Sequence, residues 1–337
     1  DVGTRTDTGP GRHRAAPAAS AGVLGLDVLI EDPHWREHRG WAMGSPSHLI
    51  VGGGDEPLVE WAVGELERLE QCWSRFRPDS ELSQLVARAG TWVSISTELL
   101  GALTRARQLW ERTAGAFDPT VGAALRSLGY DRSFSAIDRS DAGPWSAPAP
   151  APGFAAVELD EDRSAARAPE GTELDLGGLG KGLAADWVTE GLVERGAAAA
   201  LVGLGGDIRT AGTVPDGGWV IPVLDPFAGE VVWREEVLAA EAVVTSTSLI
   251  RSWTRGGRTV HHILDPLTGQ PSDTGVAAVV ARGRQAWWAE GLAKAAMIVG
   301  EACAPSMLHG TGVSAVLFRT DGSTTEVGDA EALCSPS

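Results

Sequence analysis

The segment LDLGGLGKGLAADW, residues 174–187, is the most informative stretch of this sequence. An aspartate, Asp175, precedes a run of glycines that holds a single lysine, Lys181, and an amphipathic helix is predicted to follow. Glycines let backbone N–H groups approach a ligand closely, and the start of a helix adds a partial positive charge. The segment therefore predicts a binding loop for a phosphate-bearing molecule, in which the carboxylate accepts hydrogen bonds from a base or a sugar.

The spacing of this glycine loop differs from that of two common nucleotide-binding loops. A P-loop requires a glycine five residues before Gly180, where Asp175 stands, and a serine or threonine where Gly182 stands. The G-x-G-x-x-G spacing of dinucleotide-binding folds is also absent, because Gly178, Gly180 and Gly182 alternate. We therefore expect a phosphate loop of a third kind.

The composition favours a globular enzyme or binding protein over a nucleic-acid-binding protein. Of the 337 residues, 43% are hydrophobic and 22% are charged, which is typical of folded domains. The formal net charge of −17 argues against a nucleic-acid partner, and it requires that an anionic ligand be met by local donors or a metal ion. Cys72, Cys303 and Cys334 show no metal-binding spacing, so we expect free thiols, with Cys72 packed on a helix.

The sequence gives few indications of the compartment. No apolar run approaches the roughly 20 residues of a membrane span, and the first 22 residues lack a hydrophobic signal segment. We expect a soluble protein that does not span a membrane. Because the chain begins at Asp1 rather than methionine, a processed or truncated start stays open, and with it the choice between the cytoplasm and the cell envelope.

The pattern of apolar residues predicts an α+β fold with mainly antiparallel sheets flanked by helices. We expect a disordered tail over residues 1–22 and one domain over 23–337, with a Pro/Ala-rich insertion at about 133–153 and a division into two lobes left open. Four helices and eight strands are predicted from periodicity. The helices lie at 55–77, 97–113, 181–195 and 285–299, and the strands at 43–51, 155–159, 198–202, 219–224, 231–237, 259–264, 276–281 and 314–318.

Six further motifs accompany the glycine loop. Three precede the loop in the chain and three follow it. They are MGS (43–45), FRPDSELS (76–83) and GAFDPTVG (115–122), and then LGGDI (204–208), TS (245–246) and HILDP (262–266) with TG (268–269). Each motif alone is a weak signal. Together and in this order, they resemble the FAD:protein FMN transferase (ApbE) family over most of the chain.

The resemblance implies a T-fold-related domain and a specific reaction. Enzymes of that family cleave the pyrophosphate of FAD and attach FMN through a phosphoester to a threonine or serine of a partner flavoprotein. AMP leaves, and Mg²⁺ is normally required; some relatives hydrolyse FAD to FMN and AMP instead. By resemblance, the residues that contact FAD are Met43, Phe76, Ala116, Phe117, Asp118, Asp175, Lys181 and Ile263.

The chemistry of the motifs agrees with the resemblance. Phosphoryl transfer needs positioning, charge neutralisation and a base for the attacking hydroxyl, and His262 is the candidate base. A structural histidine is the alternative, and His261 should face the other side of the strand. Asp265 either orients a metal or only forms the Asp-Pro turn.

Plainer interpretations of three predicted contacts also stay open. Asp118 could be an Asp-Pro turn residue, and Phe76 a core aromatic. Lys181 could be a solvated residue of the first helical turn, but a lysine there opposes the helix dipole, which favours a role toward a ligand.

The metal-binding motif of the family is altered in this chain. Typical members chelate Mg²⁺ with an aspartate, a threonine four residues later and a carbonyl of the glycine loop. Glu290 and Lys294 stand at the two side-chain positions, and Gly178 would supply the carbonyl. Glutamate can ligate Mg²⁺, but a protonated lysine cannot, and the two side chains could instead form an i,i+4 salt bridge.

Two outcomes follow from this alteration. Either Mg²⁺ is retained with fewer ligands or is partly replaced by the Lys294 ammonium, or the chain binds FAD without fast transfer. A non-catalytic FAD-binding protein and an FAD pyrophosphatase are therefore the alternatives to a transferase.

A pair of histidines, His34 and His38, resembles half of a zinc-binding helix. The H-E-x-x-H order is absent, because Trp35 follows the first histidine. We expect a solvated helix or loop there.

Overall fold

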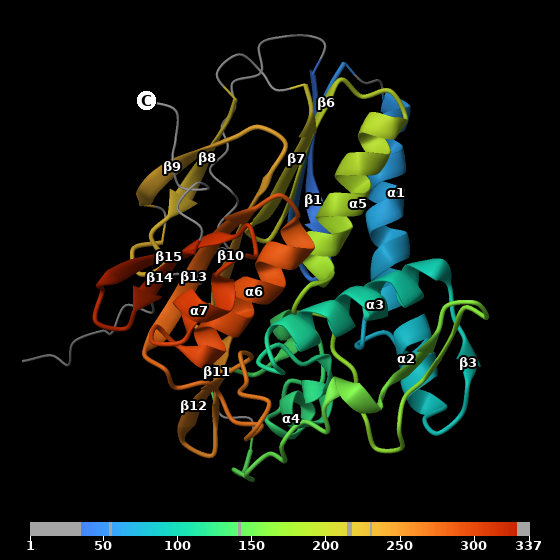
Figure 1. Cartoon of the computed structure of the whole chain (residues 1–337), viewed down its shortest axis with the longest axis vertical. Coiled ribbons are helices and arrows are strands. Elements are labelled where there is room, and N and C mark those ends of the chain that lie inside the picture. The colour runs from blue at the N-terminus through green and yellow to red at the C-terminus, as the bar shows by residue number, and fades with distance from the viewer. Residues whose placement is uncertain (1–34, 54–55, 141–142, 214–217, 230, 329–337) are drawn as a thin grey trace, which may run out of the picture.

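A computed structural model of the chain describes residues 35–53, 56–140, 143–213, 218–229 and 231–328. Its centre is an eight-stranded sheet in which all neighbouring strands run antiparallel (Figure 1). In spatial order the strands are β1 (Trp35–Ala42), β2 (Ser45–Gly52), β6 (Ala199–Leu204), β7 (Asp207–Gly212), β10 (Ala242–Thr247), β13 (Val276–Gly283), β14 (Ser314–Arg319) and β15 (Thr324–Gly328).

Helices and three small sheets surround this central sheet. The helices are α1 (Glu56–Trp73), α2 (Glu81–Ala87), α3 (Thr97–Arg112), α4 (Gly122–Ser127), α5 (Gly180–Glu194), α6 (Ala286–Val299) and α7 (Ala304–Leu308). The small sheets pair β3 (Val93–Ser94), β5 (Ala165–Arg167) and β4 (Glu158–Asp160); β8 (Trp219–Leu224) and β9 (Val232–Leu238); and β11 (Ser252–Arg255) and β12 (Arg258–His261).

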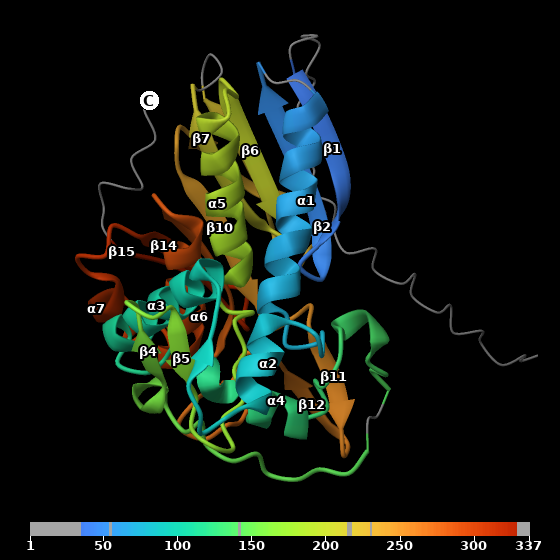
Figure 2. The ribbon, with the colours of Figure 1, turned by 90° about the vertical axis from the view of Figure 1, so that its right-hand side faces the viewer.

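Helices α1, α5 and α6 cover one face of the central sheet, and α1 and α5 lie side by side on it (Figure 2). Buried residues of α1 recur at three- and four-residue intervals, as an amphipathic helix requires: Val59, Ala62, Leu66, Leu69 and Trp73. Glycines allow α5 to pack closely. A Cβ at Gly182 would lie 2.6 Å from the Ala286 carbonyl oxygen at the start of α6. The first turn of α5 is therefore held against α6.

The other face of the sheet is covered by the β8–β9 hairpin. Trp219 and Ile221 of β8 and Leu238 of β9 pack with Ile50 of β2 and Val280 of β13. A third, smaller cluster joins α4 to the β11–β12 hairpin and includes Leu128, Tyr130 and Trp253. This cluster holds the β11–β12 hairpin against the segment that follows α3.

The predicted fold class is confirmed, and so are the four predicted helices, with α1 ending at Trp73 rather than near Arg77. One buried cluster contains Leu82 of α2, Leu103 of α3, Val202 of β6 and Val279 of β13, so the region of α2 and α3 shares its core with the central sheet. The division into two lobes is therefore not supported. Cys72 is buried on α1, as expected, and Cys303 is an exposed free thiol.

Several sequence predictions need correction or fall outside the described residues. His38 belongs to strand β1, not to a helix or loop as expected from the sequence. The other member of the histidine pair, His34, lies outside the described part of the chain. The predicted tail at 1–22 and Cys334 also lie outside it. Strands β1, β3, β5, β7, β10, β11 and β15 and helices α2, α4 and α7 were not predicted.

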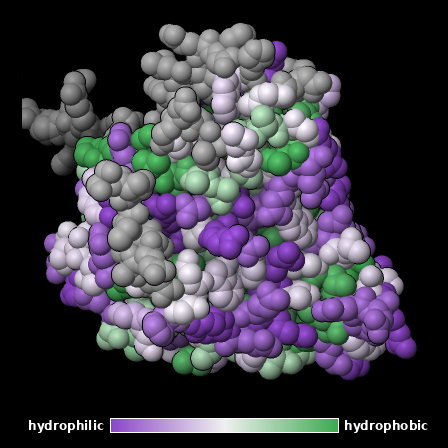
Figure 3. Space-filling view, turned by 45° about the horizontal axis from the view of Figure 1, so that its top comes forward, coloured by the Kyte–Doolittle hydropathy of each residue, from purple (hydrophilic) through white to green (hydrophobic). Residues whose placement is uncertain are grey.

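In the described ranges, every helix is too short or too polar to cross a bilayer. On the face seen with the upper end of Figure 1 turned forward, hydrophilic residues dominate the middle and hydrophobic residues form smaller patches (Figure 3).

Candidate functional site

A cavity of about 320 Å³ opens where the end of α1 meets the glycine loop and the segment after β12. Segments far apart in the sequence form its wall, from Met43 to Ile298. Ten of the predicted site residues line it: Met43, Phe76, Ala116, Phe117, Asp118, Asp175, Gly178, Lys181, His262 and Lys294. The fold therefore brings together most of the residues that the sequence motifs singled out.

The glycine loop is fixed by its aspartate. The backbone N–H of Asp175 donates to the Pro119 carbonyl at 2.7 Å. Its carboxylate accepts from Arg75 Nε at 2.7 Å and from the Gly177 N–H at 2.6 Å. Both carboxylate oxygens thus have partners within the protein. This arrangement shapes the loop and orients Arg75, and the expected hydrogen bonds to a base or sugar would have to be made in addition.

A buried charge cluster lies at the start of α5. Lys181 forms ion pairs with Asp207 and with Glu290, the latter at 2.8 Å, and the side chains of Asp207 and Glu290 are only 1% and 2% exposed. Burial lowers the pKa of Lys181, but the two carboxylates outweigh it and raise that pKa to about 12. The lysine is therefore a fixed cation. A lysine at the start of a helix is disfavoured by the helix dipole. Here the carboxylates of Asp207 and Glu290 compensate the ammonium, so a bound ligand is not needed to explain its position.

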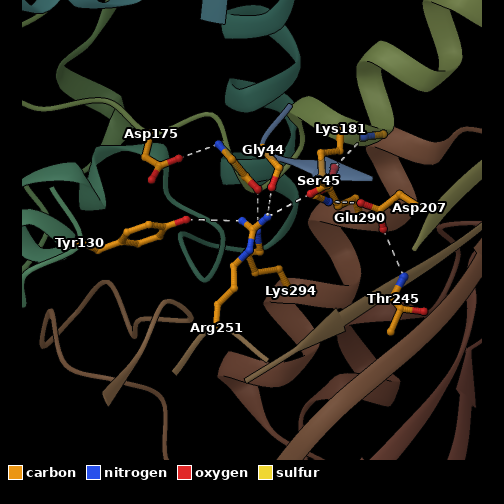
Figure 4. A network of polar contacts seen from close by, with 12 residues as sticks. Gly44, Ser45, Tyr130, Asp175, Lys181, Asp207, Thr245, Arg251, Glu290 and Lys294 are labelled. Carbon is orange, nitrogen blue, oxygen red and sulfur yellow. Dashed lines mark hydrogen bonds and ion pairs between the residues drawn. The ribbon is translucent and has the colours of Figure 1, made fainter. Parts of the chain in front are cut away.

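Glu290 has no free carboxylate oxygen in this cluster. One oxygen accepts from Lys181 Nζ and the other accepts from the Gly182 N–H at 2.8 Å. Asp207 also accepts from the Thr245 N–H, at 3.2 Å. Figure 4 shows Lys181, Asp207, Glu290 and Thr245 together, with Lys294 drawn between this cluster and Asp175.

Lys294 contacts the glycine loop instead of Glu290. Its ammonium donates to the Gly177 carbonyl at 3.1 Å, and a Cβ at Gly178 would lie 3.1 Å from the same nitrogen. Among the residues that the structure describes, no carboxylate is within ion-pair distance of Lys294 Nζ. The i,i+4 salt bridge considered from the sequence is therefore not formed.

His262 directly follows β12 and lines the cavity. Its Nδ1 atom is buried and has no hydrogen-bond partner among the described residues. Burial, together with the positive charges of Arg251 and Lys294, lowers the pKa of His262 well below 6.5. The imidazole is consequently neutral near pH 7, which is the form that accepts a proton.

Comparison with known proteins agrees with this arrangement. The sequence pattern of the ApbE family matches residues 43–317. The chain belongs to the ApbE family. A FAD:protein FMN transferase of Treponema pallidum is 30% identical over 257 residues, which are 70% of this chain and 69% of that protein. One from Rhodobacter capsulatus is 31% identical over 263 residues, which cover 77% of this chain but 47% of that protein.

A solved ApbE structure supports the fold. The ApbE protein of Thermotoga maritima superimposes with a TM-score of 0.74 at 26% identity, and the match covers 87% of this chain and 97% of that one. The antiparallel architecture described above is thus an ApbE architecture.

Two aromatic residues and two arginines form another part of the ApbE cavity wall. Phe76 is 36% exposed and lies 5.4 Å from Tyr130, ring centre to ring centre. The Arg75 guanidinium lies over both rings, 4.1 Å and 4.7 Å from their centres. Arg251 reaches from the segment before β11 to Ser45 Oγ at 3.1 Å. The partial exposure of Phe76 makes a core role less suitable than a contact with a flat ligand ring.

Met43 and Asp118 hold their local backbones in place. Met43 occupies the turn between β1 and β2 with φ 53°, and its N–H donates to Glu70 at 2.7 Å. Asp118 accepts from the Thr120 N–H at 2.8 Å and from Trp110 Nε1 at 3.1 Å, and burial raises its pKa. Asp118 therefore forms the turn that the plainer interpretation described, while still lining the cavity.

Three predicted site residues do not line the cavity: Glu290, which belongs to the buried charge cluster, Ile263 and Asp265. The last two lie elsewhere in the fold. Ile263 is 1% exposed and packs in the main core, between His262 and Leu264, which both line the cavity. The Asp265 carboxylate accepts from the Leu267 N–H and the Thr268 hydroxyl, both at 3.0 Å, so it forms its own turn. A direct side-chain contact of either residue with a ligand is not supported.

The side chains at the family's metal position do not fit a magnesium ion. Mg²⁺ requires oxygen ligands in near-octahedral geometry. Here the Glu290 oxygens are held by Lys181 and Gly182, and an ammonium, that of Lys294, lies at the glycine-loop carbonyl. No cluster of three acidic, histidine or cysteine side chains suited to a metal occurs within the described ranges.

Sequence reasoning missed four residues of this site: Arg75, Tyr130, Asp207 and Arg251. Arg75 and Asp207 stand beside or inside quoted motifs, but their partners are distant, since Asp175 is 100 residues from Arg75. Arg251 and Tyr130 belong to no motif. Only the assembled fold identifies them.

Proposed function

We propose that this chain is a FAD:protein FMN transferase that binds FAD in the described cavity. Attack by an acceptor hydroxyl forms a new bond to the phosphorus on the flavin side of the pyrophosphate. The bond from that phosphorus to the bridging oxygen breaks, and AMP leaves. The acceptor is a threonine or serine of a partner flavoprotein.

The observation that carries the proposal is the placement of His262. A neutral imidazole with an unpaired, buried Nδ1 lines the same cavity as Lys181 and Lys294, the only two lysines of the sequence. The imidazole accepts the proton of the attacking hydroxyl, while the Lys294 ammonium stabilises the phosphate charge. Family membership and the names of the relatives support the same reaction.

Other residues of the cavity wall would orient FAD. The partly exposed Phe76 ring, which packs at a tilt against the buried Tyr130, offers an apolar contact for one ring system of FAD. The glycine loop, fixed by Asp175, offers backbone groups close to the start of α5 for the pyrophosphate. When bound, Mg²⁺ would supply charge neutralisation in this family; because the residues here do not fit it, no step is assigned to it.

A single assay separates the transferase from its alternatives. The purified chain is incubated with FAD, with and without a flavoprotein acceptor, and AMP is quantified by chromatography while the acceptor is weighed by mass spectrometry. A transferase releases AMP in step with FMN attachment to the acceptor. Release of AMP and free FMN without acceptor would identify a pyrophosphatase, and FAD binding without release a flavin-binding protein.

A further inference from the structure

The whole sequence contains only two lysines, Lys181 and Lys294, and both line the same cavity. Lysines and arginines together number 28, and all of them except these two are arginines. A lysine ammonium is a compact point charge, whereas a guanidinium is a broad planar fork. Both compact cations of the sequence therefore lie at the same cavity.

The two lysines have different surroundings. Lys181 lies between Asp207 and Glu290, and its charge is balanced by theirs. Its interaction with Glu290, together with the Gly182 N–H, occupies both oxygens of the carboxylate at the family's metal position. Lys181 thus closes that carboxylate to a divalent ion.

Lys294 is held in place by a carbonyl and has no ion-pair partner among the described residues. Burial lowers the pKa of Lys294, and the more distant carboxylates of Glu290, Asp175 and Asp207 act in the opposite direction. Its only described hydrogen bond is to the Gly177 carbonyl, at 3.1 Å, and the backbone of Gly178 passes close to its nitrogen. A carbonyl orients an ammonium but does not cancel its charge. The positive charge of Lys294 is therefore available to an anion in the cavity, beside the loop suited to phosphates.

We propose that the Lys294 ammonium takes the place of the divalent cation at the FAD pyrophosphate, so that this chain binds and cleaves FAD without a divalent metal. The proposal rests on the proposed function for the identity of the ligand. Lys181 has a different part: by pairing with Glu290 and Asp207, it keeps both carboxylates from repelling the pyrophosphate.

The test measures FAD affinity by fluorescence titration, and AMP release in parallel, with Mg²⁺ and with EDTA. The proposal predicts equal affinity and equal release in the two conditions. Affinity or release that disappears in EDTA and returns with Mg²⁺ would overturn it, while leaving the transferase function intact. Failure to bind FAD in both conditions would contradict the proposed function as well.

Charge variants at position 294 make the test specific. Lys294→Met should weaken FAD binding about tenfold or more, because a hydrogen bond to a charged group is lost, and Lys294→Arg should lie between it and the unchanged chain. Arg163→Met is the matched control: it also removes one positive charge, but its side chain is 80% exposed and away from the cavity. Equal affinity in Lys294→Met and Arg163→Met would contradict the proposal.

A labelling experiment gives a readout that does not depend on turnover. Reductive methylation can modify only two lysines and the amino terminus, and peptide mass spectrometry separates them. Bound FAD should slow the methylation of Lys294 in EDTA. An unchanged rate at Lys294 under saturating FAD would place the pyrophosphate elsewhere.

Discussion

Each of two parts of the cavity carries one lysine, and the charges of the two lysines are compensated differently. We call the part at Lys181, at the start of α5, the paired wall, and the part at Lys294 and His262, beside the glycine loop, the unpaired wall. At the start of α5, Lys181 lines the cavity and pairs with Asp207 and Glu290, which are buried and do not line it. Beside the loop, Lys294 and His262 both line the cavity, and the buried Nδ1 of His262 has no hydrogen-bond partner among the described residues. We therefore expect changes in the paired wall to act mainly on folding and changes in the unpaired wall to act mainly on the ligand.

The largest effect is expected from removing the cation of the paired wall. Lys181→Met leaves Asp207 and Glu290 buried without a partner, so the free energy of unfolding should fall by about 3–5 kcal/mol. Denaturant unfolding followed by circular dichroism measures it. Lys294→Met is the matched comparison and should cost at most about 1.5 kcal/mol, because one hydrogen bond is lost. Similar losses in the two variants would show that the walls do not differ.

On the unpaired wall, the largest effect on turnover is expected at His262. His262→Ala should lower the rate of FMN transfer by about 10²–10⁴-fold, because the proton acceptor is removed, while FAD affinity stays close to that of the unchanged chain. Single-turnover AMP release and FAD titration measure the two quantities. His261→Ala, at the end of β12 and outside the cavity wall, is the control. Transfer that persists in His262→Ala would remove His262 as the base.

A smaller effect is expected at Asp175, which holds the glycine loop in place. Asp175→Ala releases Arg75 and the Gly177 N–H, so FAD affinity should weaken about tenfold or more. Asp79→Ala, whose side chain is 70% exposed, serves as the control. If titration shows the same affinity for both variants, the glycine loop does not need its aspartate to bind FAD.

The smallest effect is expected from pH. The pKa of His262 is well below 6.5, so lowering the pH from about 8 to about 6 should leave the base neutral and the transfer rate nearly constant. The rate should fall only at lower pH, as the imidazole takes up a proton. A pH profile of kcat/KM checks this. An inflection near 6.5 that disappears in His262→Ala would mean that the imidazole is not buried as described.

The two walls also differ in how far the sequence predicts them. Gly178, Lys181, His262 and Lys294 stand in or beside recognisable motifs, and the structure brings them to one cavity. The partners of Lys181 and Asp175 could not be predicted, because Glu290 and Arg75 are separated from them by 109 and 100 residues. Long-range ion pairs leave no periodic signal in the sequence.

The fold shows the same division. Helices such as α3 and α6 were predicted because their apolar residues recur with helical spacing. Strand β1 (WREHRGWA) was missed because it is mostly exposed on both faces and shows no alternation. Strand β7 was missed because it buries Asp207 and Arg209, whose charges are compensated by Lys181 and Asp186 from α5.

A crystal structure of the chain grown with FAD and Mg²⁺ tests the central claim most directly. The account predicts a pyrophosphate oxygen within about 4 Å of Lys294 Nζ, with Lys181 still paired to Glu290. A magnesium ion bound between Glu290 and the glycine loop, with Lys294 displaced from the Gly177 carbonyl, would contradict it.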